Sequence, residues 1–270
     1  MHYICPKCKG SLAEESSRAV CQNGHSFDRA RQGYYNLLLG NGGGVHGDNR
    51  DMVEARRSFL NGGFYSPLAD RVSYLVLENT PPLGRVLDAG CGEGYYTSVV
   101  EEALFSRDGD TNVLAFDISR DAVRYALRRC SRLHCAVASS YDMPIADTSI
   151  DMVVNVFSPL AIDEVRRVLK RGGHFIMVYP AEEHLFSLKA AIYDTPYKNK
   201  HEDTEIPGFS LDHIENLEYD ISLDKSEDIK NLFMMTPYAY RTSEKGRARL
   251  SSLESLKTKA SFIIALYTKI

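Results

Sequence analysis

The sequence predicts an α/β protein in which a mostly parallel, doubly wound sheet follows a small metal-binding module. Apolar runs of strand length alternate with amphipathic segments of helix length over most of the chain, as in βαβ units. A glycine-rich loop follows the first of these runs, and three of the six cysteines gather near the amino end. We therefore expect a metal-binding module over residues 1–39, a glycine-rich linker over residues 40–50 and an α/β domain over residues 51–270.

Bulk composition is that of an ordinary globular protein. Of the 270 residues, 44% are hydrophobic and 25% are charged, and no apolar stretch reaches the roughly 18 residues of a membrane helix. The amino end lacks the pattern of a secretory signal, and the cysteines are too sparse for a secreted disulfide scaffold. The net charge of -4 gives no global argument for nucleic acid. We expect a cytoplasmic protein without a membrane partner, in which any RNA binding depends on local patches.

Four potential metal ligands lie near the amino end. Cys5 and Cys8 form a Cys-x2-Cys pair, and Cys21 and His25 form a second pair further along the chain. Two tight turns that each present two such donors can supply the tetrahedral set that zinc prefers. Because all four positions are taken, the pattern indicates a structural rather than a catalytic zinc ion; a redox Cys-x-x-Cys motif or coincidence is the alternative. A unit this small would depend on the metal for its folding.

Aromatic and basic residues follow these ligands. Phe27, Tyr34 and Tyr35 are interleaved with Arg29 and Arg31. They either pack the module's own small core or form a surface that meets nucleic acid through stacking and charge, and the pattern leaves both interpretations open. The glycine-rich run that comes next is either a linker or a loop that closes over a ligand.

The chain is organised around the segment after the first strand. Asp88 stands at the carboxyl edge of an apolar run, and Gly90, Gly92 and Gly94 then form a loop that a ligand can approach closely. A helix is expected from Tyr95, and its amino end offers unpaired N–H groups. No Gly-Lys-Ser sequence follows, which argues against a triphosphate. The segment therefore predicts a site for a nucleotide-like ligand.

A second apolar run, over residues 113–117, ends in Asp117. An acid at this place binds ribose hydroxyls in dinucleotide folds. The alternative is an aspartate that caps the next helix, and both roles can coexist. Residues 120–132 are expected to form that helix, with its arginines on a solvated face.

The remaining elements follow from periodicity and turn residues. Helices are expected over residues 52–60, 162–170, 181–194, 225–235 and 243–256, and another restarts within residues 62–68 and runs to about residue 79. Strands are expected over residues 135–138, 150–157, 174–180, 211–223 and 260–267. The last two strands would form an antiparallel hairpin after the fifth parallel strand.

The glycine loop resembles the motif by which class I methyltransferases hold the methionine part of S-adenosylmethionine. The Leu-Lys-x-Gly-Gly sequence between a helix and a strand at residues 169–173 is also typical of that class. The resemblance implies the class I S-adenosylmethionine-dependent methyltransferase fold with its seven-stranded sheet. It implies further that Asp142 lies near the adenine amine and that Asn155 lies near the methyl group.

A more specific resemblance spans almost the full chain. The Cys-Pro-x-Cys start, the Gly-Tyr-x-Asn-Leu-Leu run, the Ala-Arg-Arg sequence at residues 55–57, the glycine loop and the Met-Thr-Pro-Tyr sequence at residues 235–238 resemble the RlmA family. These are bacterial guanine-N1 methyltransferases of 23S ribosomal RNA. The resemblance implies a zinc site at Cys5, Cys8, Cys21 and His25. It implies contacts with S-adenosylmethionine from Tyr65, Gly92, Glu93 and His184.

The implied target is a guanine in a domain II hairpin near the peptide exit tunnel, where methylation can affect macrolide-class antibiotics. Two subgroups modify neighbouring guanines, and residues 46–49 favour the Gram-positive type. Methylation at N1 requires alignment, exclusion of water and loss of the N1 proton. The base that takes this proton is left unassigned among Asp48, Glu93, Asp142 and His184.

Contacts with RNA are expected from aromatic and basic side chains. Tyr65, Phe157 and Tyr238 either stack on an extruded guanine or pack in the core. Several cations either contact the RNA backbone or are ordinary surface cations of an acidic protein: Arg29, Arg31, Arg50, Arg56, Arg57, Lys198 and Lys200. We expect 23S rRNA as the partner, no DNA, and either a monomer or a homodimer.

Two other functions are compatible with the sequence. One is S-adenosylmethionine-dependent methylation of a small molecule, against which the added zinc module argues. The other is zinc-dependent RNA binding without catalysis, against which the intact glycine loop and Asp117 argue.

Overall fold

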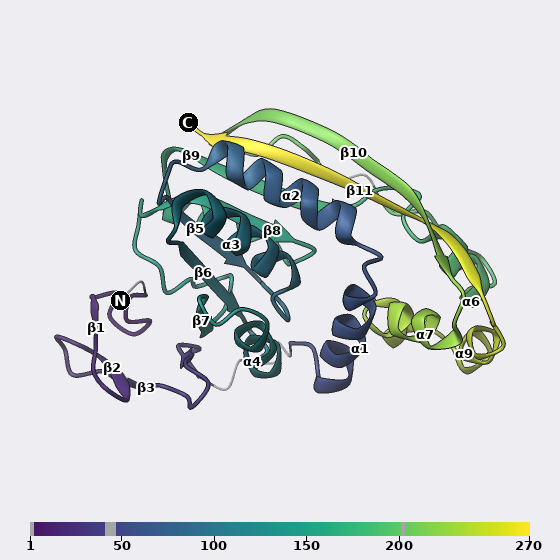
Figure 1. The fold of residues 1–270 in the computed structure, drawn as a ribbon, viewed down its shortest axis with the longest axis horizontal. Helices are drawn as coiled ribbons and strands as arrows, with labels where there is room; N and C mark the ends of the chain where they lie inside the picture. Colours follow the sequence, from purple (N-terminus) through teal and green to yellow (C-terminus); the bar gives the residue numbers. More distant parts are fainter. Residues whose placement is uncertain (1–2, 41–46, 201–202) are drawn as a thin grey trace.

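The computed structural model describes residues 3–40, 47–200 and 203–270. Its main element is an eight-stranded sheet in the order β10-β11-β9-β8-β5-β6-β7-β4 (Figure 1). The strands are β4 Tyr35–Asn36, β5 Arg85–Ala89, β6 Asn112–Asp117, β7 His134–Val137, β8 Ile150–Val156, β9 Leu169–Pro180, β10 Phe209–Leu223 and β11 Leu256–Lys269. Strands β4 to β9 pair in parallel, whereas β11 lies antiparallel between β9 and β10. The predicted mostly parallel sheet with its late antiparallel hairpin is confirmed.

Helices cover both faces of this sheet. They are α1 Arg50–Asn61, α2 Ser66–Asn79, α3 Tyr95–Asp108, α4 Arg120–Arg129, α5 Ile162–Val168, α6 Phe186–Ile192, α7 Ser226–Met234, α8 Tyr238–Arg241 and α9 Glu244–Ser251. Val86 belongs to a core that includes side chains of α2, α3 and α4, and its neighbour Leu87 belongs to a second core that includes α5. Because side chains alternate along a strand, an unbroken apolar run feeds two cores at once.

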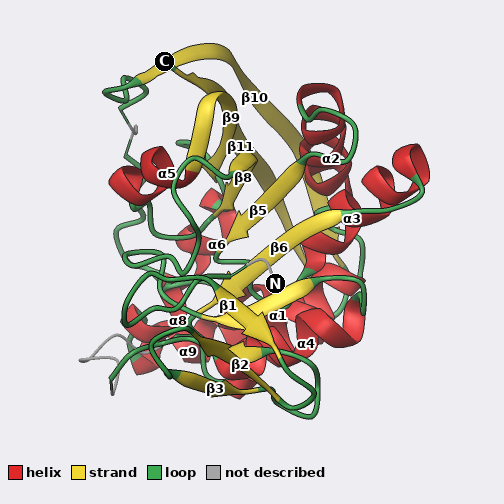
Figure 2. Cartoon of the chain, turned by 90° about the vertical axis from the view of Figure 1, so that its left-hand side faces the viewer, coloured by secondary structure: helices red, strands yellow, loops and turns green. Residues whose placement is uncertain are grey.

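The amino-terminal module shares the second of these cores. Its own antiparallel sheet consists of β1 Leu12–Glu14, β2 Arg18–Cys21 and β3 Ser26–Asp28 (Figure 2). Strand β4 then joins the edge of the main sheet beside β7. The buried Tyr3 hydroxyl lies 2.8 Å from the carbonyl oxygen of Ala115 and 2.6 Å from that of His134. Tyr34 and Tyr35 are buried. Packing is therefore the correct interpretation for these two tyrosines, although they pack on the large domain as well as on their own module.

One predicted helix is much shorter than expected. Of residues 181–194, only α6 is helical, because the backbone before it is bound to β11 instead. The N–H groups of Ala181 and Leu185 donate to the carbonyl oxygens of Ser261 and Lys259, both at 2.9 Å. Leu185 adopts a left-handed conformation with φ 54°. The resulting turn places His184 at the edge of the cavity described below.

Two other boundaries differ for a similar reason. The helix expected over residues 162–170 ends at Val168, because Leu169 already pairs with Ile150 of β8. The helix expected to residue 256 ends at Ser251, and β11 begins at Leu256, since this strand pairs with β10 along its whole length. Strand pairing decides both boundaries, and it is not visible in local periodicity.

The segment between the module and α1 is only partly described. Residues 41–46 of the linker expected over residues 40–50 lie outside the described residues, as does residue 46 of the subgroup motif. The helix α1 begins at Arg50, capped by Asn49, whose side chain accepts a hydrogen bond from the N–H of Met52. Among the helices that the structure describes, none is long and apolar enough to cross a bilayer.

Candidate active site

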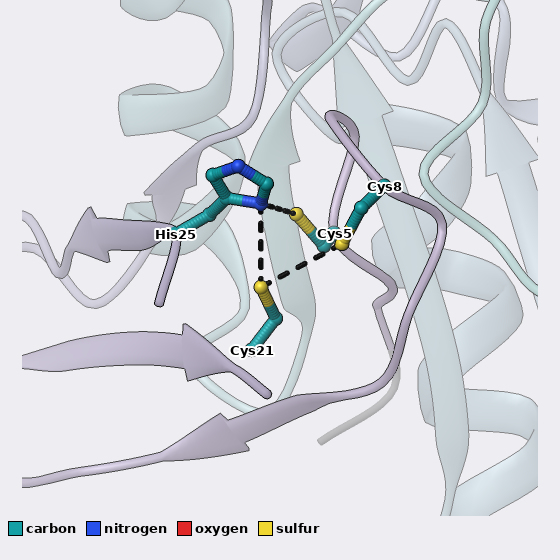
Figure 3. A group of neighbouring side chains, drawn as sticks. All are labelled: Cys5, Cys8, Cys21 and His25. Atoms are coloured by element: carbon teal, nitrogen blue, oxygen red, sulfur yellow. Dashed lines mark hydrogen bonds between the residues drawn. The ribbon is translucent and has the colours of Figure 1, made fainter. Parts of the chain in front are cut away.

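The four predicted metal ligands come together in the amino-terminal module (Figure 3). Their donor atoms all lie within 4.8 Å of one another. Nδ1 of His25 is 3.5 Å from Sγ of Cys5 and 3.4 Å from Sγ of Cys21, and the Sγ atoms of Cys8 and Cys21 are 3.6 Å apart. A tetrahedral zinc ion with bonds of about 2.0–2.3 Å needs donor separations of about 3.5–3.8 Å. The cluster therefore fits the predicted structural zinc.

Each ligand pair sits in a turn with one left-handed residue. Gly24 has φ 76°, and its N–H donates to the carbonyl oxygen of Cys21 at 2.9 Å. In the first turn the left-handed residue is Lys9, with φ 58°. The left-handed residue is thus a glycine in the second turn and a lysine in the first.

A cavity of about 850 Å³ lies at the carboxyl ends of β5, β6 and β8. Eight residues predicted to bind the methyl donor line it: Tyr65, Asp88, Gly90, Gly92, Glu93, Asp117, Asn155 and His184. A second wall comes from α1, from the segment after β8, and from α8 with the turn before it. Its residues include Met52, Arg56, Phe157, Met235, Tyr238 and Tyr240. The cavity thus has the predicted polar half and a largely aromatic half that was not predicted as one surface.

The glycines of the loop allow close contact with different neighbouring segments. Gly90 has φ 93°, and a Cβ at this position would overlap the side chain of Ser158, which follows β8. Gly94 has φ 83°, and a Cβ there would lie 2.7 Å from Cα of Ala126 on α4. Gly94 does not line the cavity. Its place in the structure is the contact between the loop and α4.

Asp88 is a buried acid on the floor of the cavity. Its Oδ2 accepts a hydrogen bond of 2.5 Å from the hydroxyl of Thr97, in the first turn of α3. Burial raises the pKa of Asp88 to about 7 although this hydrogen bond acts in the opposite direction. A cationic group in the cavity would restore the ionised carboxylate. The ammonium of the methionine part of S-adenosylmethionine has the required charge.

Asp117 is held by two backbone N–H groups. Its Oδ2 accepts from Gly92 at 3.0 Å and its Oδ1 accepts from Ser119 at 2.7 Å. The N-cap of α4 is Ser119, whose own side chain accepts from Ala122, so Asp117 is not the capping residue. Burial raises the pKa of Asp117. Its carboxylate therefore ties the glycine loop to the end of β6 and also faces the cavity.

Glu93 anchors the loop through a buried ion pair. Its Oε2 accepts from Nη2 of Arg129 at 2.7 Å, and the residue is 1% exposed. Burial raises the pKa of Glu93, and the Arg129 charge opposes that shift. Arg132 likewise pairs with the buried Glu101. The prediction of a solvated face is therefore wrong for Arg129, whose side chain is 17% exposed, whereas Arg132 stays exposed while it compensates the buried carboxylate of Glu101.

Tyr65 and His184, two of the predicted donor-binding residues, form a hydrogen-bonded pair on the side of the cavity that carries the aromatic half. Nδ1 of His184 accepts from the backbone N–H of Ser261 at 3.2 Å, so the neutral ring carries its proton on Nε2. Nε2 lies 3.4 Å from the Tyr65 hydroxyl oxygen, which is therefore the acceptor. Burial, together with the charge of Lys189, lowers the pKa of His184 to about 3. The Tyr65 hydroxyl consequently keeps its own hydrogen for donation to a ligand.

Two further predicted residues differ in placement. The Nδ2 group of Asn155 faces the carbonyl oxygens of Ala89 and Pro159, at 3.4 and 3.5 Å, which fixes its amide beside the glycine loop. Asp142 does not line the cavity; its half-exposed carboxylate pairs with Lys9 of the amino-terminal module. Its neighbours from Ala138 to Tyr141 do line the cavity. The loop after β7 therefore flanks the site, whereas contact between Asp142 and adenine stays a prediction.

Comparison with known proteins agrees with this arrangement. The methyltransferase-domain family matches residues 82–234, and the family described as RlmA, N-terminal, a zinc ribbon, matches residues 3–39. A 23S rRNA (guanine(748)-N(1))-methyltransferase of Streptomyces fradiae is 37% identical over 70% of this chain and 66% of the relative. A Bacillus subtilis protein, provisionally named a 23S rRNA (guanine-N(1)-)-methyltransferase, is 30% identical over 95% of this chain and 92% of the relative. The chain belongs to the RlmA family.

A solved structure supports the fold alone. A protein of Bacillus halodurans C-125, provisionally named a methyltransferase, matches with a TM-score of 0.50 at 15% identity, over 70% of this chain and 94% of that one. As expected for the RlmA family, the class I methyltransferase fold, S-adenosylmethionine as the donor and a structural zinc are thus confirmed for this chain.

In this RlmA-family site, every candidate for the catalytic base already has an ion-pair or hydrogen-bond partner. The carboxylates of Asp48, Glu93 and Asp142 pair with Arg56, Arg129 and Lys9, respectively. His184 already accepts a hydrogen bond at the nitrogen that could take a proton. The base therefore remains unassigned, and the described side chains point to positioning and exclusion of water as their main contribution.

Sequence reasoning missed three contacts that shape the site. Thr97 orients Asp88, Ser158 packs on Gly90, and Tyr240 donates its hydroxyl hydrogen to Sδ of Met52. A hydroxyl in the first turn after a glycine loop could have indicated Thr97. The other two contacts join distant segments and have no local signal.

Proposed function

We propose that this protein transfers a methyl group from S-adenosylmethionine to N1 of a guanine in 23S rRNA. The observation that carries the proposal is the combination, in one chain, of an RlmA-type zinc ribbon with a methyltransferase cavity whose floor is a buried acid. Relatives that bear the name of this reaction support it. The donor, when bound, supplies an electrophilic methyl group on a sulfonium.

The chain's own residues would hold the two reactants in line. We propose that Asp88 binds the donor's ammonium, that Tyr65 binds its carboxylate and that Asp117 binds its ribose. N1 of guanine forms the new bond to the methyl carbon, the carbon–sulfur bond breaks with its electron pair retained by sulfur, and the N1 proton leaves to water. No metal is needed for this displacement, which agrees with a zinc ion that is enclosed by four protein ligands.

We further propose that the target lies in the domain II hairpin near the peptide exit tunnel and that its methylation alters the response to macrolide-class antibiotics. The Streptomyces fradiae relative is named for guanine 748, which supports that position among the neighbouring guanines.

RNA recognition by the amino-terminal module is part of the proposal. Arg29 and Arg31 are exposed on it and suit contacts with phosphates. Arg56, in contrast, pairs with Asp48, and Arg57 lies over the Tyr125 ring at 5.2 Å, so these two are less available. A double Arg29→Ala, Arg31→Ala variant should lower the salt dependence of RNA affinity by a slope of about one to two units.

The deciding experiment offers labelled S-adenosylmethionine to 23S rRNA from cells that lack the enzyme. Label at N1 of one guanine, mapped by primer extension and lost when that guanine is replaced, supports the proposal. Label only in small metabolites would indicate a small-molecule enzyme, and no label would indicate an RNA-binding protein. Mapping rRNA from matched deleted and complemented cells would then identify the nucleotide.

A further inference from the structure

Large apolar side chains gather, exposed, around the mouth of the cavity. Tyr141 is 64% exposed, Phe157 42%, Leu160 38% and Tyr240 68%, and all four line the cavity. They come from the loop after β7, the segment after β8, and α8. We call these four residues the rim. An exposed apolar patch beside a functional cavity indicates a surface that a ligand covers.

Phe157 is held in place by an unusual backbone and by an aromatic cluster. Its φ is 57°, a left-handed conformation that bulky residues rarely adopt. Its N–H donates to the carbonyl oxygen of Val178 on β9 at 3.1 Å. The ring centroid lies 5.6 Å from that of Phe262 and 6.5 Å from that of His184, with an interplanar angle of 27° to the latter. One side of the ring is therefore supported by buried rings while much of its surface stays exposed.

The position of Phe157 relates it directly to methyl transfer. Ser158, the next residue, packs on Gly90 of the glycine loop, and Asn155 is fixed beside the same loop. The Phe157 ring thus stands next to the part of the cavity assigned to the donor. Such strain persists at sites where it sets a functional geometry.

Tyr240 is fixed from the other side of the mouth. It belongs to α8, and its hydroxyl hydrogen bonds to Met52 on α1. Its ring is nevertheless the most exposed of the large apolar side chains at the rim. The nearby Arg56 forms an ion pair with Asp48. The mouth of the cavity therefore presents aromatic rings to a ligand rather than the charge of Arg56.

We propose that the rim binds unstacked nucleobases, with the target guanine on Phe157 and an adjacent base on Tyr240, so that the enzyme accepts RNA only as an opened loop. This inference rests on the proposed function, since it assigns the rim to the same RNA substrate. Every base has a π face that can stack on an aromatic ring, whereas a paired A-form helix presents mainly phosphates and hydroxyls. The rim suits the first kind of substrate.

The test measures methyl transfer to a hairpin RNA and, separately, binding of a fluorescent single-stranded RNA. Phe157→Leu should lower kcat about tenfold, and Phe157→Tyr should restore most of it. Tyr240→Leu should raise KM for RNA and weaken RNA binding about tenfold. The donor affinity should change by less than about twofold in each variant, which also shows that the fold is intact.

The matched control is Tyr74→Leu, because Tyr74 is 51% exposed on α2 and does not line the cavity. Wild-type enzyme should also methylate the loop at least about tenfold faster than a fully paired duplex with the same guanine. If the rim variants behave like Tyr74→Leu, or if loop and duplex react equally fast, the inference is wrong while the proposed function stands. If wild-type protein methylates no rRNA but Tyr240→Leu still weakens RNA binding, the proposed function is wrong. The inference that the rim binds nucleobases would still stand in that case.

Discussion

The glycine-loop side of the cavity, which we call the donor half, comes from one continuous stretch of chain, residues 88–119. The aromatic half combines α1, Tyr65, the segment after β8, His184, and α8 with the turn before it. Tyr65, Asn155 and His184, which are also predicted to contact the donor, lie outside the continuous stretch. The donor half is polar and is fixed by hydrogen bonds among neighbours, such as those of Asp117 with Gly92 and Ser119. The aromatic half is fixed by ring packing and by backbone bonds to distant strands. The donor half can therefore be predicted from local sequence, whereas the aromatic half forms only after folding.

The largest effect is expected where the two halves touch. Gly90→Ala places a methyl group against Ser158 at a backbone with φ 93°. We expect the free energy of unfolding to fall by about 2–4 kcal/mol from strain and overlap. Donor affinity should fall roughly a hundredfold, because a loop shift of about 1 Å can have that effect. Thermal unfolding and titration calorimetry measure the two changes.

Gly109→Ala is the matched control for this change. Gly109 also has a positive φ, of 75°, but an added Cβ would meet nothing within 4 Å. The Gly109→Ala substitution should lower the free energy of unfolding by about 1 kcal/mol and leave donor affinity unchanged. Equal losses of donor affinity in both variants would mean that contact between the halves is unimportant.

A smaller effect is expected inside the aromatic half. Tyr65→Phe removes the acceptor for the buried Nε2–H of His184, which should lower stability by about 1–3 kcal/mol. Loss of a hydroxyl donor to the ligand's carboxylate should weaken donor binding about tenfold. Tyr125→Phe, whose hydroxyl donates to the half-exposed Glu54, should change stability by about 0.5 kcal/mol and donor binding not at all. Unchanged donor affinity in Tyr65→Phe would remove Tyr65 from the donor site.

The features that these variants test differ in how far they could be predicted from the sequence. The sheet, its hairpin and the zinc ligands were predicted because apolar runs and ligand spacing are local signals. The turn that carries His184 was wrongly predicted to be helical. Its conformation depends on hydrogen bonds to β11, and local sequence does not reveal those bonds. The two-residue strand β4 had no sequence signal, because it exists only through pairing with β7. Asp88 and Asp117 were found, but the ring contacts of Phe157 required the fold.

The acid of the donor half should make donor binding depend on pH. The raised pKa of Asp88, about 7, means that the free folded protein retains a proton that the unfolded chain releases near pH 4. Its contribution to stability is therefore present below about pH 4 and is lost as the pH rises through 7. Donor binding has the opposite dependence, since an ammonium prefers the ionised carboxylate.

We expect S-adenosylmethionine to bind about tenfold more weakly at pH 5.5 than at pH 7, because the ionised fraction of Asp88 falls by about that factor. His184, with a pKa lowered to about 3, stays neutral across this range. Calorimetry at both pH values, on wild-type protein and on Asp88→Asn, separates the contributions. A wild-type protein with no more pH dependence than Asp88→Asn would contradict the assignment.

The smallest effect is expected at the outer edge of the donor half, where Asp142 pairs with Lys9. Both side chains are about half exposed, and surface pairs of this kind contribute about 0–1 kcal/mol. Asp142→Asn and Lys9→Ala should therefore each change stability by less than about 1 kcal/mol and donor affinity by less than about twofold. A tenfold loss of donor affinity in Asp142→Asn, without a matching loss in Lys9→Ala, would instead place this carboxylate on the adenine amine. That result would extend the donor half beyond its continuous stretch, to a loop that the zinc module helps to hold.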